Sequence, residues 1–513
     1  MSKRKVLYLI VCMAVAVSGV YADVKLPSVI GNDMVLQQGK PLPIWGWADP
    51  GEQVTVQFAK QKKSATTDSD GHWRVDLKAV KAGGPHTMTI SGKNTVTLDN
   101  ILIGEVWVCS GQSNMQMSVG GSDNAKQEIA QANYPNIRLF TAERTIADAP
   151  QCDVKGSWVE CSPATVADFS AAGYFFGRNL QKDLNLPIGL INSSWGGTLA
   201  EAWTSDSTLK ADPDYSEILK RGTDLIETFK KDFDKYEMDY ADWKEQLKNT
   251  LAEGSPLPDM PAAPRSPYRN PNRPSVLYNG MLAPLIPFAV QGAIWYQGES
   301  NAARAYQYRT LFSDMIQDWR KNWELEDLSF FFVQLANFDQ TYAPATSWAE
   351  LREAQNMALS LPKTGMAVII DIGNPKDIHP KNKQEVGRRL ALAAEGVTYG
   401  QDVVYSGPMY KSMVTEAGKI RVSFDHLGGG LICGDAGDLK GFTIAGADKQ
   451  FVPAQAKIDG DTVVVWADAV ANPVAVRYGW ADNPDYCNLY NKAGLPSSPF
   501  RTDDWPCVTA DAK

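Results

Sequence analysis

Residues 104–117 read GEVWVCSGQSNMQM, an apolar, β-branched run that stops abruptly at a short polar turn. The run predicts a buried strand, and the residues after it predict the start of a helix. A serine exposed at the end of such a strand, with helix amides behind it to stabilise negative charge, is typical of a nucleophile turn. Serines also cap helices frequently, so Ser113 alone does not identify an enzyme.

The chain around this stretch alternates between strand-like and helix-like patterns. Apolar runs such as PIGLINSSWGG, VQGAIWYQGE, LSFFFVQLAN and GMAVIIDIG are separated by amphipathic stretches such as FSAAGYFFGRNLQKDL and YQYRTLFSDMIQDWRKNW. This alternation predicts an α/β domain with a parallel sheet over residues 101–399. Its chemistry is expected in the loops beyond the carboxyl ends of the strands.

Both flanks of this domain have β patterns. Residues 23–100 contain short alternating runs separated by turn signals such as DPGE and DSDGH, which predict a β-sandwich. That domain either binds carbohydrate or braces its neighbour, and we favour bracing because no row of exposed aromatic residues is visible. Runs such as KIRVSFDH and TVVVWAD predict a second β region over residues 400–513.

An insertion interrupts the α/β domain at residues 213–276. Its first part, residues 213–253, is charged and helical in period, and the part that follows is too proline-rich for a helix or sheet interior. We interpret it as a surface excursion, with a lid over the substrate site as the alternative.

The N-terminus has the pattern of a secretory signal. Lys3, Arg4 and Lys5 precede the apolar run VLYLIVCMAVAV, and small residues follow it, which predicts a signal peptide over residues 1–22 with cleavage after Ala22. No later stretch is apolar and long enough to span a bilayer. We therefore expect a periplasmic or secreted protein.

Composition excludes some partners and cofactors. The 513 residues carry a net charge of −9 without a basic stripe, which argues against nucleic acid. With four histidines and no closely paired cysteines, a metal site is not expected. An oxidising compartment permits disulfides, for which the candidate pairs are Cys152 with Cys161 and Cys487 with Cys507.

The scarcity of histidine narrows the search for a catalytic base. Only His379 falls within residues 101–399, in a loop that follows the apolar run MAVIID. Asp377 precedes it by two residues, and such a carboxylate can orient an imidazole and stabilise its charged form.

These stretches together resemble a known family. LPSVIGNDMVLQQGKPLPIWGWADPGE, GEVWVCSGQSNMQ, INSSWGGTLAEAW, LYNGMLAPL, AIWYQGESNA, DIGNPKDIHPKNK and LPSSPFRTDDW are similar to motifs of the sialate O-acetylesterase family of SGNH hydrolases. The resemblance covers nearly all of the chain after residue 22. It implies a flavodoxin-like, three-layer SGNH domain flanked by the two β regions.

The resemblance also implies roles for the site residues. Ser113 matches the nucleophile and is also counted among the oxyanion donors. Either Gly196 or Gly197 of the SSWGG stretch matches the glycine whose amide binds the oxyanion. The side-chain amide of Gln297 matches the third donor, with Asn301 as the alternative.

The acid is the point where this chain departs from the pattern. Many relatives place it three residues before the histidine, whereas Asp377 and His379 are two apart. Asp377 remains the expected orienting acid, while Glu299 in the QGE turn either shares that role or braces the oxyanion loop.

The implied reaction is removal of O-acetyl groups from carbohydrate through an acetyl-enzyme, without metal or cofactor. Sialic acids are the expected substrate, with Arg352 as a candidate partner for their carboxylate or, alternatively, a member of a surface salt bridge. Acetyl xylan or another acetylated polysaccharide is the alternative substrate. The non-enzymatic alternative is a glycan-binding module with a decayed site. The acetylated hydroxyl and the oligomeric state are left open.

Overall fold

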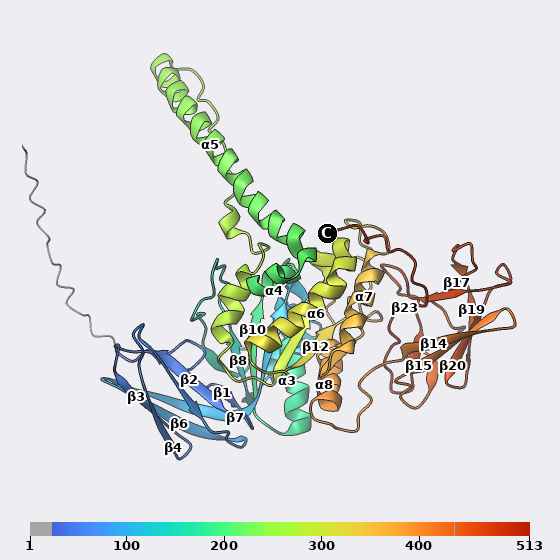
Figure 1. Ribbon diagram of the computed structural model, residues 1–513, viewed down its shortest axis with the longest axis horizontal. Helices are drawn as coiled ribbons and strands as arrows, with labels where there is room; N and C mark the ends of the chain where they lie inside the picture. The colour runs from blue at the N-terminus through green and yellow to red at the C-terminus, as the bar shows by residue number, and fades with distance from the viewer. Residues whose placement is uncertain (1–22, 436) are drawn as a thin grey trace, which may run out of the picture.

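The structure is a computed structural model that describes residues 23–435 and 437–513. The predicted signal peptide at residues 1–22 therefore lies outside the described residues. Figure 1 shows three parts in a row: a β region from the N-terminal part of the chain, a central α/β part, and a C-terminal β region. Within the described residues, no helix is both long enough and apolar enough to cross a membrane.

The central part is built on a twisted sheet. In spatial order its strands are β13 (Thr364–Ala367), β12 (Ser329–Val333), β11 (Gly292–Tyr296), β7 (Thr95–Gly111), β10 (Ile188–Ser194), β8 (Tyr134–Thr141) and β9 (Trp158–Cys161). Neighbours pair in parallel from β13 to β8, and only the edge strand β9 is antiparallel. The predicted parallel sheet is confirmed for these six strands.

Helices cover both faces of this sheet, which explains why its strands are apolar throughout. On β7, Trp107 and Cys109 pack with α3 (Ala171–Leu184) and α8 (Lys383–Val397) on one face. Val106 and Val108 belong to the core on the other face, which includes α6 (Ala305–Asn322) and α7 (Ser347–Met357). The shorter helical elements are α1 (Ser113–Gln116), α2 (Ala125–Gln131), α4 (Asp206–Ala211), η1 (Val119–Gly121), η2 (Ala200–Trp203), η3 (Pro213–Tyr215), η4 (Pro267–Arg269), η5 (Tyr278–Leu282), η6 (Ala283–Leu285), η7 (Glu299–Arg304) and η8 (Ala358–Ser360).

The N-terminal β region is joined to the central sheet through β7 itself. The first part of β7 pairs with β6 and β1, while its last part lies between β10 and β11. In the rest of this region, β3 pairs with both β4 and β6, and β2 pairs with β5 in a separate two-stranded sheet. Their bounds are β1 (Val35–Gln37), β2 (Leu42–Trp47), β3 (Gln53–Phe58), β4 (Gln61–Thr66), β5 (His72–Leu77) and β6 (Gly83–Ser91).

The C-terminal part is also β-structured, with two four-stranded antiparallel sheets and one two-stranded sheet. Its strands are β14 (Met409–Glu416), β15 (Lys419–Asp425), β16 (Leu431–Cys433), β17 (Phe442–Ala445), β18 (Val452–Pro453), β19 (Gln455–Asp459), β20 (Thr462–Trp466), β21 (Ala475–Tyr478), β22 (Leu489–Asn491) and β23 (Phe500–Arg501).

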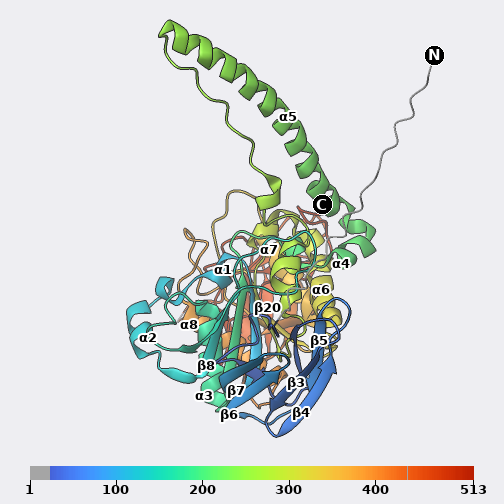
Figure 2. The ribbon, with the colours of Figure 1, turned by 90° about the vertical axis from the view of Figure 1, so that its left-hand side faces the viewer.

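The insertion forms an arm. Helix α5 (Ser216–Glu253) projects away from the body, and an extended segment returns along it (Figures 1 and 2). Of the residues of α5, only Ile218 is buried. The tip therefore does not cover the central sheet, and the arm is closer to the predicted surface excursion than to a lid.

The six cysteines of residues 23–435 and 437–513 are unpaired. Cys109, Cys152, Cys161, Cys433, Cys487 and Cys507 are all free. This corrects the expected pairs: Cys152 is exposed whereas Cys161 is buried, and Cys507 accepts hydrogen bonds from Arg309 and Arg501 rather than meeting Cys487.

Candidate active site

The candidate residues lie on loops at one edge of the central sheet. Ser113 follows β7, Gly196 follows the neighbouring β10, and Gln297 follows β11 on the other side of β7. After β7 the chain builds β8, β9 and β10 on one side of β7, and it then crosses over to build β11, β12 and β13 on the opposite side. Such a reversal of strand order opens a crevice at the carboxyl ends of the strands, where ligands bind.

The turn before Ser113 is held tightly against β11. Gly111 has φ +135°, and a Cβ there would lie 2.2 Å from the carbonyl oxygen of Tyr296, so only glycine fits. The next backbone N–H, that of Gln112, donates to the same carbonyl at 3.0 Å. The side-chain oxygen of Gln112 accepts from the backbone N–H groups of Gly298 and Ser300, both at 3.3 Å. This turn fixes the first residue of α1, Ser113, over the sheet edge.

Ser113 and His379 are in hydrogen-bond contact. The serine Oγ lies 2.9 Å from Nε2 of the imidazole, although the two residues are 266 positions apart in the chain. The other ring nitrogen, Nδ1, is 3.6 Å from Oδ1 of Asp377. That oxygen accepts instead from the backbone N–H of His379, at 2.9 Å. The nucleophile–base contact is therefore formed, while the contact between ring and acid is longer than a hydrogen bond.

Glu299 occupies a different place. Its Oε1 accepts from the Asn114 side chain at 2.6 Å, and the same amide nitrogen donates to the backbone oxygen of Ile378 at 3.0 Å. Burial raises the pKa of the Glu299 carboxyl, and its Oε2 has no hydrogen-bond partner within the described residues. Glu299 therefore acts on the histidine loop through Asn114, with the oxygen of Ile378 as the link.

A buried lysine completes this cluster. Nζ of Lys383 donates to Oδ1 of Asn114 and to the backbone oxygen of Pro380, each at 2.7 Å, and lies 4.9 Å from the centre of the Tyr296 ring. Burial lowers the pKa of Lys383 to about 7, against the opposing effects of Glu299 and Asp377. A neutral amine has two N–H groups, which matches its two acceptors. Asn114 and Lys383 thus tie the loop on both sides of His379 to α1.

Gly196 is the glycine that lies against Ser113. A Cβ on Gly196 would be 3.2 Å from that of Ser113, whereas a Cβ on Gly197 would have nothing within 4 Å. The backbone N–H of Gly196 donates to the side-chain oxygen of Gln116 at 2.6 Å. Gly197 instead contacts the insertion that forms the arm, because its carbonyl oxygen accepts a hydrogen bond from the Asn272 side chain at 3.1 Å.

Gln297 and Asn301 do not reach this position. The Gln297 amide nitrogen donates to the backbone oxygen of Thr198 and to the side-chain oxygen of Asn301, and its own oxygen accepts from Tyr308. Asn301 donates to Glu201 at 2.9 Å. Both residues are buried. The structure thus corrects their assignment as oxyanion donors, because these amides tie neighbouring loops together.

Arg352 is likewise a structural residue. Its side chain is completely buried, and its guanidinium donates to the backbone oxygens of Leu335, Ala336, Ala481 and Asp482. Neither a substrate carboxylate nor a surface salt bridge is compatible with this setting. Arg352 joins α7 to the C-terminal β part.

Three residues at the site were not singled out from the sequence: Asn114, Gln116 and Lys383. The first two lie inside the GQSNMQ motif, so the sequence shows that they are near Ser113 but does not show what their side chains contact. Lys383 has the local pattern of a surface lysine at a helix start, and its burial beside Asn114 and the Tyr296 ring is seen only in the folded chain.

The chain is similar to known carbohydrate esterases. A family model described as carbohydrate esterase, sialic acid-specific acetylesterase, matches residues 103–232 and 271–395. The chain is 31% identical to the sialate O-acetylesterase of Mus musculus, over 93% of the chain and 94% of the relative. It is 29% identical to that of Homo sapiens, over 93% of the chain and 92% of the relative. A crystal structure of a carbohydrate acetylesterase from Xanthomonas citri is 39% identical and superposes with a TM-score of 0.81, covering 94% of this chain and all of that one.

Proposed function

Because the chain belongs to the sialate O-acetylesterase family of carbohydrate esterases, we propose that it removes O-acetyl groups from sugars through an acetyl-enzyme on Ser113. The contact of 2.9 Å between Ser113 Oγ and His379 Nε2 is the observation that carries this proposal. The alternative of a glycan-binding module without activity is set aside, since the chain is an esterase by its relatives.

The mechanism has two acyl-transfer steps. His379 accepts the proton of Ser113 as Oγ attacks the acetyl carbonyl, and it then gives that proton to the departing sugar oxygen. Water attacks the resulting acetyl-serine, with His379 again as base, and acetate leaves. Asp377, 3.6 Å from Nδ1, stabilises the charged ring and needs only a small movement to form a hydrogen bond. Hydrogen bonds of this kind often tighten only when substrate is bound.

We assign the binding of the oxyanion to two backbone amides, those of Ser113 and Gly196. The N–H of Ser113 has no acceptor within the described residues, and the N–H of Gly196 is bonded only to the side chain of Gln116. The oxyanion would replace that glutamine oxygen. Each preorganised donor of this type contributes about 3 kcal/mol to transition-state stabilisation.

The family favours O-acetylated sialic acids as substrates, and we assign their carboxylate to a residue other than Arg352. The exposed Arg144 has its guanidinium 5.8 Å from the centre of the Trp195 ring, and Trp195 directly precedes Gly196. A guanidinium held on an aromatic face is a suitable partner for a carboxylate. In this proposal Arg144 binds the sialate carboxylate beside the oxyanion site.

Acetylated neutral polysaccharides such as acetyl xylan are the second candidate. One observation favours them: the arginine that the sequence indicated for a carboxylate, Arg352, is unavailable. The catalytic steps would be the same, and only the contribution of Arg144 would disappear. We also infer that the protein is exported to the periplasm or secreted, where such glycans are accessible. Its sequence from Lys3 to Ala22 supports this.

The test is release of acetate by residues 23–513 from O-acetylated sialic acid and from acetylated xylan oligosaccharides, with Ser113→Ala as control. We expect serine-dependent release from the sialate, and a rise in KM for that substrate alone in Arg144→Ala. Release from xylan only, or equal effects of Arg144→Ala on both substrates, would replace the sialate proposal. Lack of release from both, and from an aryl acetate, would contradict the mechanism.

A further inference from the structure

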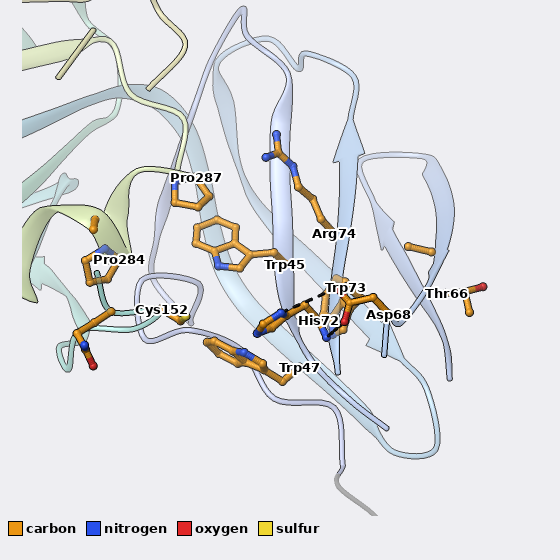
Figure 3. Close-up of a pocket in the computed structure, with 14 residues that line it drawn as sticks. Trp45, Trp47, Thr66, Asp68, His72, Trp73, Arg74, Cys152, Pro284 and Pro287 are labelled. Atoms are coloured by element: carbon orange, nitrogen blue, oxygen red, sulfur yellow. Dashed lines mark hydrogen bonds and ion pairs between the residues drawn. The ribbon is translucent and has the colours of Figure 1, made fainter. Parts of the chain in front are cut away.

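A groove lies between the N-terminal β region and the central part. Its volume is about 530 Å³, within the range of small-molecule sites. One wall is formed by Trp45, Trp47, His72 and Arg74 of the β2–β5 pair, with Trp73 between them. Figure 3 shows the Trp45 indole beside Pro287 and the Trp47 indole below it, with Cys152 and Pro284 on the facing wall.

This groove is not part of the candidate active site. The N-terminal strands pair with the first part of β7, through contacts such as that of Val35 with Leu102, whereas Ser113 follows the last residue of β7, Gly111. From Leu102 to Gly111 a strand extends about 30 Å. The facing wall agrees with this placement, since Pro284 and Pro287 precede β11 and thus lie near its amino end.

The two half-buried indoles form a regular platform. Trp45 and Trp47 alternate with buried residues on β2, so both point to the same face. Residues i and i+2 of a strand are about 6.7 Å apart, which allows two consecutive rings to be contacted by one extended ligand. An indole offers a large, rigid apolar face with a polar edge.

Polar groups flank this platform without an excess of charge. Arg74 is opposite Trp45 and is paired with Asp76 at 2.9 Å, while His72 is opposite Trp47 and lies 4.0 Å from Asp68. Balanced charges do not favour an anionic or a cationic ligand.

We propose that this groove is a non-catalytic carbohydrate-binding site for neutral pyranose units. The apolar face of a pyranose ring stacks on Trp45 and Trp47, and its hydroxyl groups bond with Asp68, His72 and Arg74. The choice of a sugar as ligand rests in part on the proposed function, because a carbohydrate esterase meets such chains at its substrate. The site would hold unacetylated stretches of glycan while the acetylated residue is at Ser113.

The test measures binding directly. Full-length mature protein carrying Ser113→Ala is titrated calorimetrically with xylohexaose and cellohexaose, which are neutral and carry no ester. Trp45→Ala with Trp47→Ala is compared with Trp466→Ala, which removes a half-buried indole from the C-terminal part. We expect binding to weaken at least tenfold in the double variant and to be unchanged in Trp466→Ala. With Ser113 restored, the double variant should hydrolyse a small aryl acetate within twofold of the parent.

A second measurement does not depend on the folding of that variant. Cys152 is exposed and lines the groove. Bound xylohexaose should slow its alkylation, followed by peptide mass spectrometry, without slowing that of Cys433. Absence of binding by both oligosaccharides, equal affinity in the double variant, or unchanged alkylation of Cys152 would each overturn the proposal. Because binding is measured without turnover, failure of the proposed esterase activity would be seen separately.

Discussion

The side-chain oxygen of Gln116 lies 2.6 Å from the backbone nitrogen of Gly196, on the side of the glycine that faces Ser113. The backbone N–H group that is proposed to bind the oxyanion therefore already donates a hydrogen bond to a side-chain carbonyl oxygen. A neutral hydrogen bond of this kind contributes about 1 kcal/mol net, so a developing oxyanion, which bonds more strongly, can displace it. The arrangement keeps the amide oriented in the resting enzyme.

Gln116→Glu should therefore inhibit the enzyme. A carboxylate on the Gly196 amide binds more tightly than the glutamine oxygen and repels the oxyanion, so we expect kcat/KM for an aryl acetate to fall at least tenfold. Gln116→Ala leaves the amide free and should retain activity close to that of the parent. Full activity in Gln116→Glu, or an equal loss in both variants, would contradict this role.

Ser113→Ala and His379→Ala should each abolish nearly all turnover in a folded protein. The two residues act as a unit, so we expect each change to lower kcat by a factor of about 10³ or more, with the double variant no worse than either single one. Initial rates of acetate release give the comparison, and thermal unfolding checks the fold. Additive losses would show that the two residues act independently.

Asp377→Asn should affect catalysis more than Glu299→Gln. Asp377 is the carboxylate beside the ring, but at 3.6 Å and partly exposed, so we expect a loss of about 10- to 100-fold, less than for a buried, hydrogen-bonded acid. A glutamine at position 299 keeps an oxygen for the Asn114 side chain, so its loss should stay under tenfold. The reverse order of kcat/KM would assign the orienting role to Glu299.

Lys383 should make stability depend on pH. Its pKa is about 7 in the folded protein and near 10.4 in an unfolded chain, so between these values the unfolded state holds one more proton. The free energy of unfolding contributed by this group therefore rises with pH over that window, by at most about 1.4 kcal/mol per pH unit. Between pH 7.5 and 9.0 the parent should gain about 1 to 2 kcal/mol relative to Lys383→Met.

Urea unfolding at the two pH values measures this difference. Glu299 and Asp377 face the lysine in both proteins, so the subtraction removes most of their contribution. If the free energy of unfolding changes with pH by the same amount in the parent and in Lys383→Met, the amine stays protonated in the folded protein.

Arg352→Met should destabilise the protein without changing substrate preference. The substitution removes four hydrogen bonds and leaves the backbone oxygens of Leu335 and Ala481 without a donor within the described residues, so we expect a loss of about 3 kcal/mol or more in the free energy of unfolding. Arg388→Met, which removes a half-exposed arginine bonded to Glu385, is the control and should cost less than about 1 kcal/mol. A KM effect confined to sialate substrates in Arg352→Met would restore its predicted substrate role.

The elements that sequence patterns specify strongly were predictable. The apolar run that forms the last part of β7 has no polar face, and this pattern is typical of a strand covered on both sides. Several such runs in the chain predicted the parallel sheet. His379 was identifiable because histidine is rare in this chain. Its contact with Ser113 depends on which strands are neighbours, and the motifs of the family supplied that information.

The errors arose from side-chain amides and cations, whose local sequence is the same whether they are buried or exposed. Gln297 follows a strand at the correct sheet edge, yet Tyr308 of α6 and Thr198 turn its amide away from Ser113. Arg352 lies on a helix whose exposed face was not predictable before the C-terminal part was placed against it. The sequence WGW contains both Trp45 and Trp47, but two aromatic residues in a short stretch were too few to predict an exposed aromatic platform.

The arm at α5 has a practical consequence for measurements of size in solution. A helix of 38 residues extends about 57 Å, more than twice the radius of gyration of about 24 Å expected for a compact chain of this length. Friction on such a projection slows diffusion, so a single chain will elute from a gel-filtration column ahead of globular standards of equal mass. Molar mass from light scattering, compared between the full chain and one shortened across the tip, separates this effect of shape from self-association.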